Sequence, residues 1–278
     1  MESLKRTALV YDFDGTLAPG NIQEHTFIPG LGVEKDVFWA EVERRAREHD
    51  ADQILVYMWH MLEVSKQLGV PITRESLEAH GRETPLFAGV ESWFERIDEF
   101  GRERGLAIEH YIVSSGTAEM IRGCSIHRFF KQVYASRFIF DADGNAVWPG
   151  VAINYTTKTQ FLFRINKGID STWDNSTINR WTPMEDRPIP FSRMIFLGDG
   201  ETDIPSMKLV RQQGGYSIAV FDPDRWKTAR TQEHVYRLIA EDRAHFTVPA
   251  DYLEDSQLAV TVRGVLGRIA RDEGYRGE

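Results

Sequence analysis

The sequence predicts an α/β protein built on a doubly wound parallel sheet. Short apolar segments alternate with stretches whose apolar residues recur every three or four positions, which is the pattern of strands alternating with helices. The chain has 278 residues, of which 42% are hydrophobic and 27% are charged. This length allows one large domain with a smaller companion. We therefore expect a Rossmann-like core with a small α-helical cap domain inserted into it.

Six segments have the composition of buried strands. The first two are separated by roughly a hundred residues, far more than one crossover helix needs. A separate module is therefore expected between them. The predicted strands are residues 8–13, 110–114, 132–136, 194–198, 216–221 and 245–249.

The intervening segment, from residue 18 to residue 85, is predicted to be helical. Residues 34–50 and 52–69 carry apolar side chains at helical spacing. Thr73 is a candidate N-cap for a short third helix. We interpret this segment as a cap, after which an amphipathic helix over residues 89–105 resumes the core. The predicted domains are residues 1–17 and 86–278 for the core, and 18–85 for the cap.

Three other segments have simpler interpretations. Residues 141–145, DADGN, predict a β-hairpin turn rather than a calcium loop, because no glutamate follows at EF-hand spacing. Residues 168–192 are rich in Asn, Thr, Asp and Pro and predict a long loop or flap, which would either cover the site or form an interaction surface. Tyr57 and its aromatic and methionine neighbours are at helical spacing, which favours the core of the cap over the substrate pocket.

Composition argues against several partners. The formal net charge is −9, and there is no basic stripe, so a nucleic-acid partner is disfavoured. The single cysteine, Cys124, excludes an intramolecular disulfide and fits a reducing cytoplasm. The apolar run at residues 8–13 is too short for a signal peptide or a membrane span. We expect a cytoplasmic protein without membrane or nucleic-acid partners.

Candidate functional residues follow the ends of three predicted strands. In a doubly wound sheet, ligands bind beyond the carboxyl ends of the strands, so residues just after each strand share one rim. Two of these strand ends have carboxylates and the third has serine and glycine. A purely structural sheet would not be expected to have this pattern. The residues are Asp12 and Asp14, then Ser114, Ser115 and Gly116, then Asp199 and Asp203.

Converging carboxylates repel one another unless a cation neutralises them, and oxygen ligands without a His or Cys cluster favour Mg²⁺. Beside a phosphate, one acid can attack phosphorus while the other protonates the leaving oxygen. Gly15 and Thr16 offer backbone N–H groups in a tight turn. Lys158, at the start of an amphipathic stretch, is the best candidate for the cation that the phosphate needs. Lys167 lies near the far end of that stretch, where a basic residue usually interacts with the helix terminus.

These motifs resemble those of the haloacid dehalogenase superfamily of phosphohydrolases. DFDGT, IVSSG, Lys158 and GDGETD occur in the order typical of that superfamily and span most of the chain. The helical insert between the first two motifs is similar to the cap of the phosphoserine-phosphatase-like branch. The second Asp of DFDGT is absent from dehalogenases and phosphonate hydrolases of the superfamily, so a phosphate ester is the expected substrate.

The resemblance also implies roles for individual residues. Asp12 would be the nucleophile and Asp14 the general acid and base, with Ser114 and Lys158 holding the phosphate. Asp12, Asp199 and the backbone carbonyl of Asp14 would bind magnesium. Asp203 would support the metal or the lysine.

Glu24 lies just after the first motif, where the phosphoserine-phosphatase-like branch has an acidic residue that contacts the substrate's amino group. The local pattern leaves two interpretations open, substrate contact or a solvated linker. Overall we expect a Mg²⁺-dependent phosphomonoesterase that hydrolyses a small phosphorylated metabolite through an aspartyl-phosphate. The alternatives are a phosphotransferase or mutase of the same superfamily and a non-catalytic phosphate-binding regulatory module.

Overall fold

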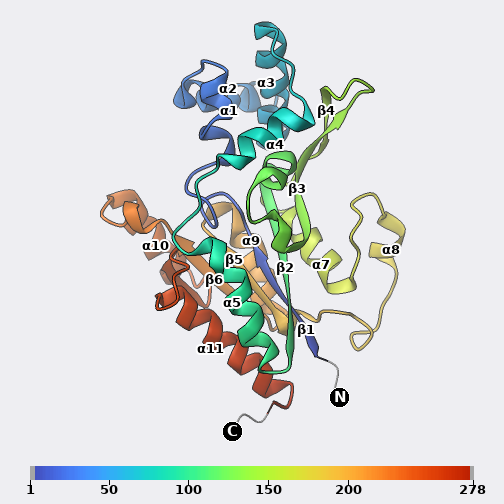
Figure 1. Cartoon of the computed structure of the whole chain (residues 1–278), viewed down its shortest axis with the longest axis vertical. Coiled ribbons are helices and arrows are strands. Elements are labelled where there is room, and N and C mark those ends of the chain that lie inside the picture. The colour runs from blue at the N-terminus through green and yellow to red at the C-terminus, as the bar shows by residue number, and fades with distance from the viewer. Residues whose placement is uncertain (1–3, 276–278) are drawn as a thin grey trace.

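The computed structural model describes residues 4–275 and shows a seven-stranded sheet with helices on both faces (Figure 1). The strand order is β4–β3–β2–β1–β5–β6–β7, and each neighbouring pair is parallel except β3 and β4, which form an antiparallel hairpin. The strands are β1 (Lys5–Tyr11), β2 (Leu106–Thr117), β3 (Phe130–Phe140), β4 (Ala146–Val151), β5 (Met194–Gly198), β6 (Tyr216–Phe221) and β7 (Phe246–Pro249).

The central strand β1 is apolar on both faces because both are covered by helices. Leu9 and Tyr11 belong to the cluster that includes helices α5 and α11, whereas Ala8 and Val10 face α7, α9 and α10. A strand that is buried on both faces is typical of a doubly wound sheet. The core helices are α5 (Val90–Arg102), α6 (Ala118–Gly123), α7 (Lys158–Lys167), α8 (Asn175–Asn179), α9 (Ile204–Gln212), α10 (Ala229–Ala240) and α11 (Gln257–Asp272).

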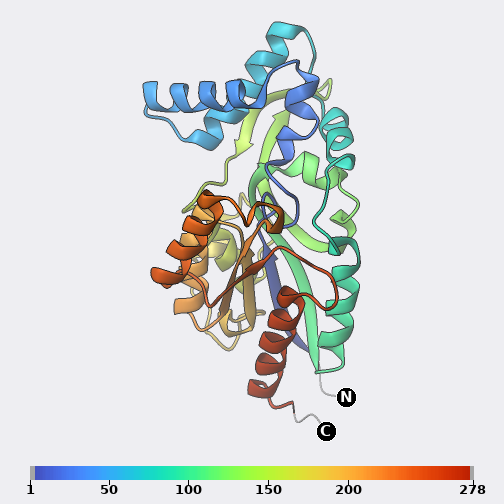
Figure 2. The ribbon, with the colours of Figure 1, turned by 90° about the vertical axis from the view of Figure 1, so that its left-hand side faces the viewer.

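The segment between β1 and α5 is helical and lies beyond the carboxyl ends of the strands (Figure 2). Asp52 caps the N-terminus of its longest helix by accepting the backbone N–H groups of Ile54 and Leu55. Thr73 and Ser76 form a reciprocal capping box at the start of the last helix, with Ser76 in the position usually held by Glu. The helices are α1 (Phe27–Gly30), α2 (Lys35–Glu48), α3 (Gln53–Leu68) and α4 (Arg74–Arg82), preceded by the 3₁₀ turn η1 (Ile22–Glu24).

Helix α4 is held tightly on the core. A Cβ atom on Gly81 would lie 1.8 Å from the carbonyl oxygen of Met120 in α6, and one on Gly123 would lie 2.0 Å from that of Glu78. The backbones of α4 and α6 can approach this closely only because both positions are glycine. On the other side, the backbone N–H of Ala146 in the β3–β4 hairpin donates to the carbonyl of Ile72 at 2.7 Å. The end of the helical segment is thus fixed between two parts of the core.

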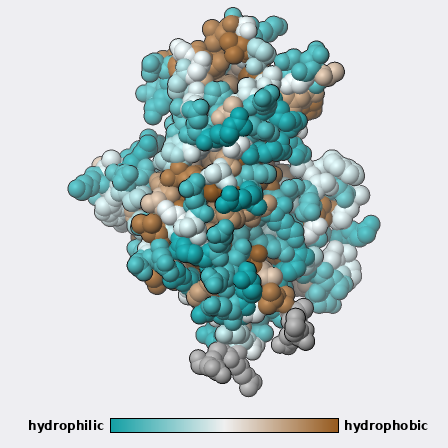
Figure 3. Space-filling view, viewed as in Figure 1, coloured by the Kyte–Doolittle hydropathy of each residue, from teal (hydrophilic) through white to brown (hydrophobic). Residues whose placement is uncertain are grey.

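The structure confirms the predicted fold class and the six predicted strands, and it lengthens β2 and β3. The turn predicted at residues 141–145 connects β3 to β4, with Gly144 at a φ of +82°. Residues 168–192 are mostly irregular and contain only the short helix α8 and the start of a 3₁₀ turn at Phe191. Within residues 4–275, no helix is long and apolar enough to cross a membrane. The face shown in Figure 3 is mostly hydrophilic, with a hydrophobic group at the far end of the helical segment.

Candidate active site

The residues that follow the central strands meet at one edge of the sheet. Strand β1 lies between β2 and β5, and Tyr11 at its end is paired with Ile112 on one side and Leu197 on the other. Asp12 and Asp199 therefore leave neighbouring strand ends. One carboxylate oxygen from each of Asp12, Asp199 and Asp203 lies within 4.8 Å of the others. The sheet thus brings together acidic residues almost two hundred positions apart in the sequence.

Lys158, the first residue of α7, lies in the middle of this acidic group. Its Nζ is 2.9 Å from Oδ2 of Asp12 and 2.7 Å from Oδ1 of Asp203. The side chains of Lys158 and Asp203 are fully buried, and Asp12 is 4% exposed. A buried lysine needs such partners because its charge is costly to remove from water. The other oxygen of Asp12 accepts the backbone N–H of Phe13 at 2.7 Å.

A tight turn after β1 places Asp14 near Asp12. Gly15 has a φ of +72°, and its N–H donates to the carbonyl of Ala18 at 2.7 Å. A Cβ atom at Gly15 would lie 2.0 Å from Oδ2 of Asp199, so this position needs glycine for both its conformation and its contact. Oδ1 of Asp14 accepts the backbone N–H of Ile22 at 2.8 Å, which turns this carboxylate toward η1.

The crowded carboxylates have raised pKa values. Burial, followed by the charge of Asp12, raises the pKa of Asp14 to about 8 and that of Asp199 to about 7. The same two causes raise the pKa of Asp203 well above its ordinary value. Burial would lower the pKa of Lys158, but Asp12 and Asp203 outweigh it and raise that pKa. The site therefore carries more negative charge than its lysine can neutralise.

The donor set fits a hard divalent cation. Asp12, Asp199 and Asp203 supply converging oxygen ligands, and Oδ2 of Asp203 is buried without a hydrogen-bond partner among the described residues. Oxygen ligands of this kind suit Mg²⁺, which keeps several positions for water or a phosphate oxygen. The structure brings Asp203 into this group, whereas the side chain of Asp14 is engaged with Ile22.

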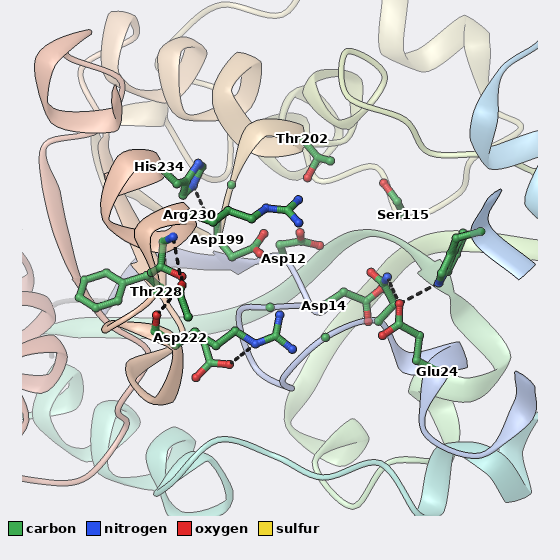
Figure 4. Close-up of a pocket in the computed structure, with 18 of the residues that line it drawn as sticks. Asp12, Asp14, Glu24, Ser115, Asp199, Thr202, Asp222, Thr228, Arg230 and His234 are labelled. Carbon is green, nitrogen blue, oxygen red and sulfur yellow. Dashed lines mark hydrogen bonds and ion pairs between the residues drawn. The ribbon is translucent and has the colours of Figure 1, made fainter. Parts of the chain in front are cut away.

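Asp12, Asp14 and Asp199 line one wall of an open cleft of about 1290 Å³. Figure 4 shows Asp12, Asp14 and Asp199 together, with Glu24 on one side and Arg230 and His234 on the other. The cleft also receives Trp39 from α2, so the helical segment contributes to its lining. A pocket that combines a few convergent polar groups with shifted pKa values is the expected form of an active site.

Comparisons with known proteins agree with this arrangement. No family model matches the chain. An uncharacterized protein of Borreliella burgdorferi is 29% identical over 227 residues, which are 73% of this chain and 78% of that protein. A hydrolase of the haloacid dehalogenase (HAD) family from Salmonella enterica serovar Typhi matches with a TM-score of 0.55 and 14% identity, over 94% of this chain and 71% of the other.

Two structures of phosphoserine phosphatase match as well. A substrate-bound complex has a TM-score of 0.57 at 17% identity, over 94% of this chain and 98% of the other. A phospho-aspartyl intermediate analogue has a TM-score of 0.54 at 18% identity, over 94% and 99%. The chain shares the fold of these three solved structures. In this chain the ends of β1 and β5 supply the acidic cluster, and the end of β2 supplies Ser114, Ser115 and Gly116, called the serine motif below.

Within this fold, the two serines at the end of β2 differ in exposure to the cleft. Ser114 is fully buried, and its Oγ accepts the backbone N–H of Gly116 at 3.0 Å. Ser115 lines the cleft, and its carbonyl accepts a 2.8 Å hydrogen bond from the hydroxyl of Tyr57. A Cβ atom on Gly116 would lie 2.8 Å from Oδ2 of Asp14, so the serine motif and the first motif are in close contact.

Thr16 is buried beneath the turn. Its hydroxyl has no partner among the described residues, and its carbonyl accepts the hydroxyl of Tyr252 at 2.7 Å. Glu24 lines the cleft, where its Oε1 accepts Nε1 of Trp39 at 2.8 Å and Nδ2 of Asn21 at 2.6 Å. Glu24 thus faces the cleft and is tied to the helical segment through Trp39.

Lys167 and the segment 168–192 lie outside the cleft. Nζ of Lys167 donates to the carbonyls of Ile178 and Arg180, so this lysine stabilises the conformation of residues 168–192. No residue of 168–192 lines the described cleft, and Trp173 and Trp181 are each 81% exposed. Of the two arrangements expected for this segment, the structure shows an exposed surface rather than a cover of the site.

The wall that follows β6 was not predicted from the sequence. Asp222, Arg225 and Thr228 come from the loop after this strand, and Arg230 and His234 come from α10. Nε2 of His234 lies 3.1 Å from the backbone carbonyl oxygen of Asp199, which connects α10 directly to the acidic cluster. The signal was present, because β6 is another parallel strand whose carboxyl end reaches the same rim.

Proposed function

We propose that the protein is a Mg²⁺-dependent phosphomonoesterase that hydrolyses a small phosphorylated metabolite through an aspartyl-phosphate on Asp12. The observation that carries this proposal is the contact of Asp12 with Lys158, inside a cluster of three carboxylates of which Asp12 and Asp199 line an open cleft. The similarity to phosphoserine phosphatases, one of them a phospho-aspartyl intermediate analogue, supports it. We also propose a cytoplasmic location, because the chain has a single cysteine.

In the first step, a carboxylate oxygen of Asp12 attacks phosphorus and the bond to the leaving oxygen breaks. Lys158 holds the charge of Asp12 in position and offers a cation to the phosphoryl oxygens. Asp14 gives its proton to the leaving alcohol, a role that suits a carboxyl group whose pKa is raised to about 8. The backbone N–H groups of Gly15 and Thr16, expected from the sequence to be free donors, are used inside the turn, where they donate to the carbonyls of Ala18 and Phe13.

In the second step, water attacks the phosphorus of the aspartyl-phosphate, and Asp14 takes its proton. The bond between phosphorus and Asp12 breaks, which releases inorganic phosphate and restores the carboxylate. Asp12, Asp199 and Asp203 would hold Mg²⁺, which neutralises negative charge on the phosphoryl oxygens when it is bound. Ser114 and Gly116 shape the rim against Asp14.

The test measures hydrolysis of an aryl phosphate with and without Mg²⁺, followed by acid quenching and mass spectrometry of the phosphorylated peptide. Magnesium-dependent turnover with phosphate on Asp12 is expected, and Asp12→Asn should abolish it without changing the circular dichroism spectrum. Phosphate on another residue would refute the assignment of the nucleophile. Absence of turnover would favour the regulatory module, and efficient transfer to an added alcohol would favour a phosphotransferase.

We further propose that residues 18–85 form a substrate-selecting cap over a core of residues 1–17 and 86–278. The support is that Glu24 and Trp39, both from this segment, line the cleft. Closure of such a cap would expel water and strengthen the electrostatic contacts of the phosphate. Because Ile22 is bound to Asp14 and α4 is packed on α6, the part that can be exchanged is α2 with α3.

The cap is tested by replacing residues 33–71 with a short Gly/Ser linker. Weak activity on small aryl phosphates should remain, while the preference among phosphorylated metabolites should be lost. Trp173→Ala with Trp181→Ala is the matched control on the exposed segment and should leave substrate ranking unchanged. A ranking that survives loss of α2 and α3 would place specificity in the core.

A further inference from the structure

The wall formed by the β6–α10 segment contains an arginine whose side chain has no partner among the described residues. Arg230 lines the cleft and forms no ion pair or hydrogen bond through its side chain with any described residue. Figure 4 shows its side chain pointing into the cleft, on the same side as Asp12 and Asp199. An unpaired arginine in a cleft is a ready donor for a carboxylate or phosphate oxygen.

A second arginine on the same wall, Arg225, is oriented by an ion pair with Asp222. Nε of Arg225 lies 3.3 Å from Oδ2 of Asp222, whose Oδ1 accepts the backbone N–H of Asp224 at 2.9 Å. Asp222 is thus fixed by its own turn and orients Arg225 through a single nitrogen. The two terminal nitrogens of that guanidinium form no hydrogen bond with a described residue, and the side chain is 64% exposed. Arg225 can therefore bind an anion without losing Asp222.

The opposite side of the cleft carries both charges, because Lys35 lines it together with Glu24 and Glu43. Glu24 lies beside Asp14 there, and it is held by Trp39 of α2. Lys158, buried behind Asp12, and the proposed magnesium ligands already serve the phosphoryl group. Arg225 and Arg230 are consequently not needed to balance the acidic cluster, and they are available for a different part of the ligand.

We propose that Arg225 and Arg230 form a subsite for a second negatively charged group of the substrate, a carboxylate or a second phosphate. The substrate class is then a phosphate monoester that carries another anionic group a few bonds from the ester oxygen. This inference rests on the proposed function, because it names what the same cleft selects. It assigns part of the specificity to the core segment after β6, in addition to the cap.

The subsite is tested by calorimetric binding to the Asp12→Asn protein with Mg²⁺, which removes turnover from the measurement. The ligands are phosphoglycolate, ethylene glycol bisphosphate and ethyl phosphate, which differ in the second group. Phosphoglycolate or the bisphosphate should bind about tenfold or more tightly than ethyl phosphate. Which of the two binds more tightly identifies the second group as carboxylate or phosphate.

Arg225→Gln combined with Arg230→Gln should reduce this preference to about twofold or less. Lys227→Gln is the matched control, because it removes a positive charge from the same segment at an exposed residue that does not line the cleft. Arg230→Glu should reverse the preference, so that phosphoethanolamine binds more tightly than phosphoglycolate. Equal affinity for all three esters, a preference that survives the double substitution, or no measurable binding would each overturn the subsite.

A failure of the subsite is distinguishable from a failure of the proposed function. Turnover of an aryl phosphate by the native protein reports the catalytic proposal alone, because that ester has no second anionic group. The difference in affinity between the three esters, measured on the Asp12→Asn protein, reports the subsite, because the phosphoryl group is common to all three. If Arg230 instead contacted the transferred phosphoryl group, the double substitution would weaken all three esters equally, and that result also overturns the proposal.

Discussion

Asn154 donates a hydrogen bond of 2.5 Å from its Nδ2 to Oδ2 of Asp52, and this contact connects the first turns of two helices. Asp52 caps α3 of the helical segment with its other oxygen, while the carbonyl of Asn154 accepts the backbone N–H of Lys158 at the start of α7. The helix that carries the buried lysine is thus bonded to the helical segment above it. The position of α3 is therefore expected to influence the position of Lys158.

Substitution of Asp52 should separate capping from this contact. Asp52→Ala should lower the free energy of unfolding by about 1 kcal/mol, because it removes the N-cap of α3. Asp52→Ser keeps a capping oxygen but is too short to reach Asn154, so stability should change less while kcat falls severalfold. Chemical denaturation and turnover of an aryl phosphate measure the two effects. Full turnover by Asp52→Ser would show that the contact does not position Lys158.

Tyr57→Phe should make the backbone at Ser115 less well held. The substitution removes the hydroxyl that donates to the carbonyl of Ser115 at 2.8 Å and leaves that acceptor without its partner. The expected cost is about 1–3 kcal/mol of stability, with a fall in kcat larger than any change in KM. Tyr275→Phe, at an exposed tyrosine near the end of the described chain, is the control. An unchanged kcat would restrict Tyr57 to packing.

Gly15→Ala should disturb Asp199 directly. The new methyl group would occupy the place of Oδ2 of Asp199, and the φ of +72° is unfavourable for alanine. Stability should fall by roughly 1–3 kcal/mol, and the Mg²⁺ concentration for half-maximal turnover should rise steeply. Gly144→Ala is a useful control, because that glycine has a φ of +82° in an open hairpin turn with no neighbouring atoms. A normal magnesium requirement in Gly15→Ala would contradict the close contact.

The contribution of Asp14 and Asp199 to the stability of the metal-free protein should fall as the pH rises from about 4 to about 8. Asp14 and Asp199 have folded-state pKa values of about 8 and about 7, above the ordinary value of 3.8. Between these limits the folded state binds more protons than the unfolded state, so the free energy of unfolding decreases with pH. Because Mg²⁺ binds the deprotonated carboxylates, it should raise Tm more at pH 8 than at pH 5. Thermal unfolding in chelator and in Mg²⁺ measures this difference, and a rise in Tm on adding Mg²⁺ that is no larger at pH 8 than at pH 5 would contradict the raised pKa values.

Much of the fold could be predicted because periodicity and strand composition are local properties. The six strands, the long helices and the 141–145 hairpin are recognisable for that reason, and the carboxyl ends of parallel strands place Asp12 and Asp199 at one rim from the sequence alone. Lys158 could be placed there only by its position at the start of a helix, because no local pattern encodes a contact with Asp203, 45 residues away.

The remaining parts depend on long-range packing. The wall that follows β6 was not predicted, because whether Arg230 points into the cleft depends on where α10 packs. Tyr57 was assigned to the core of the helical segment. It is indeed 3% exposed, but its hydroxyl reaches the carbonyl of Ser115. The ring of Tyr57 can be buried while its hydroxyl contacts the site. The spacing of apolar residues in the sequence predicts the burial of the ring but not the contact of the hydroxyl.

The hairpin that supports α4 has a consequence for how this architecture can be recombined. The backbone of Ala146 is bonded to Ile72, and Arg74 lies over the ring of Phe140 at 4.4 Å. If residues 18–85 alone were moved into another protein, the insert would lose its contacts with the β3–β4 hairpin. The helical segment and the β3–β4 hairpin are separate in the sequence but form one structural unit. They should therefore be inherited, or engineered, together.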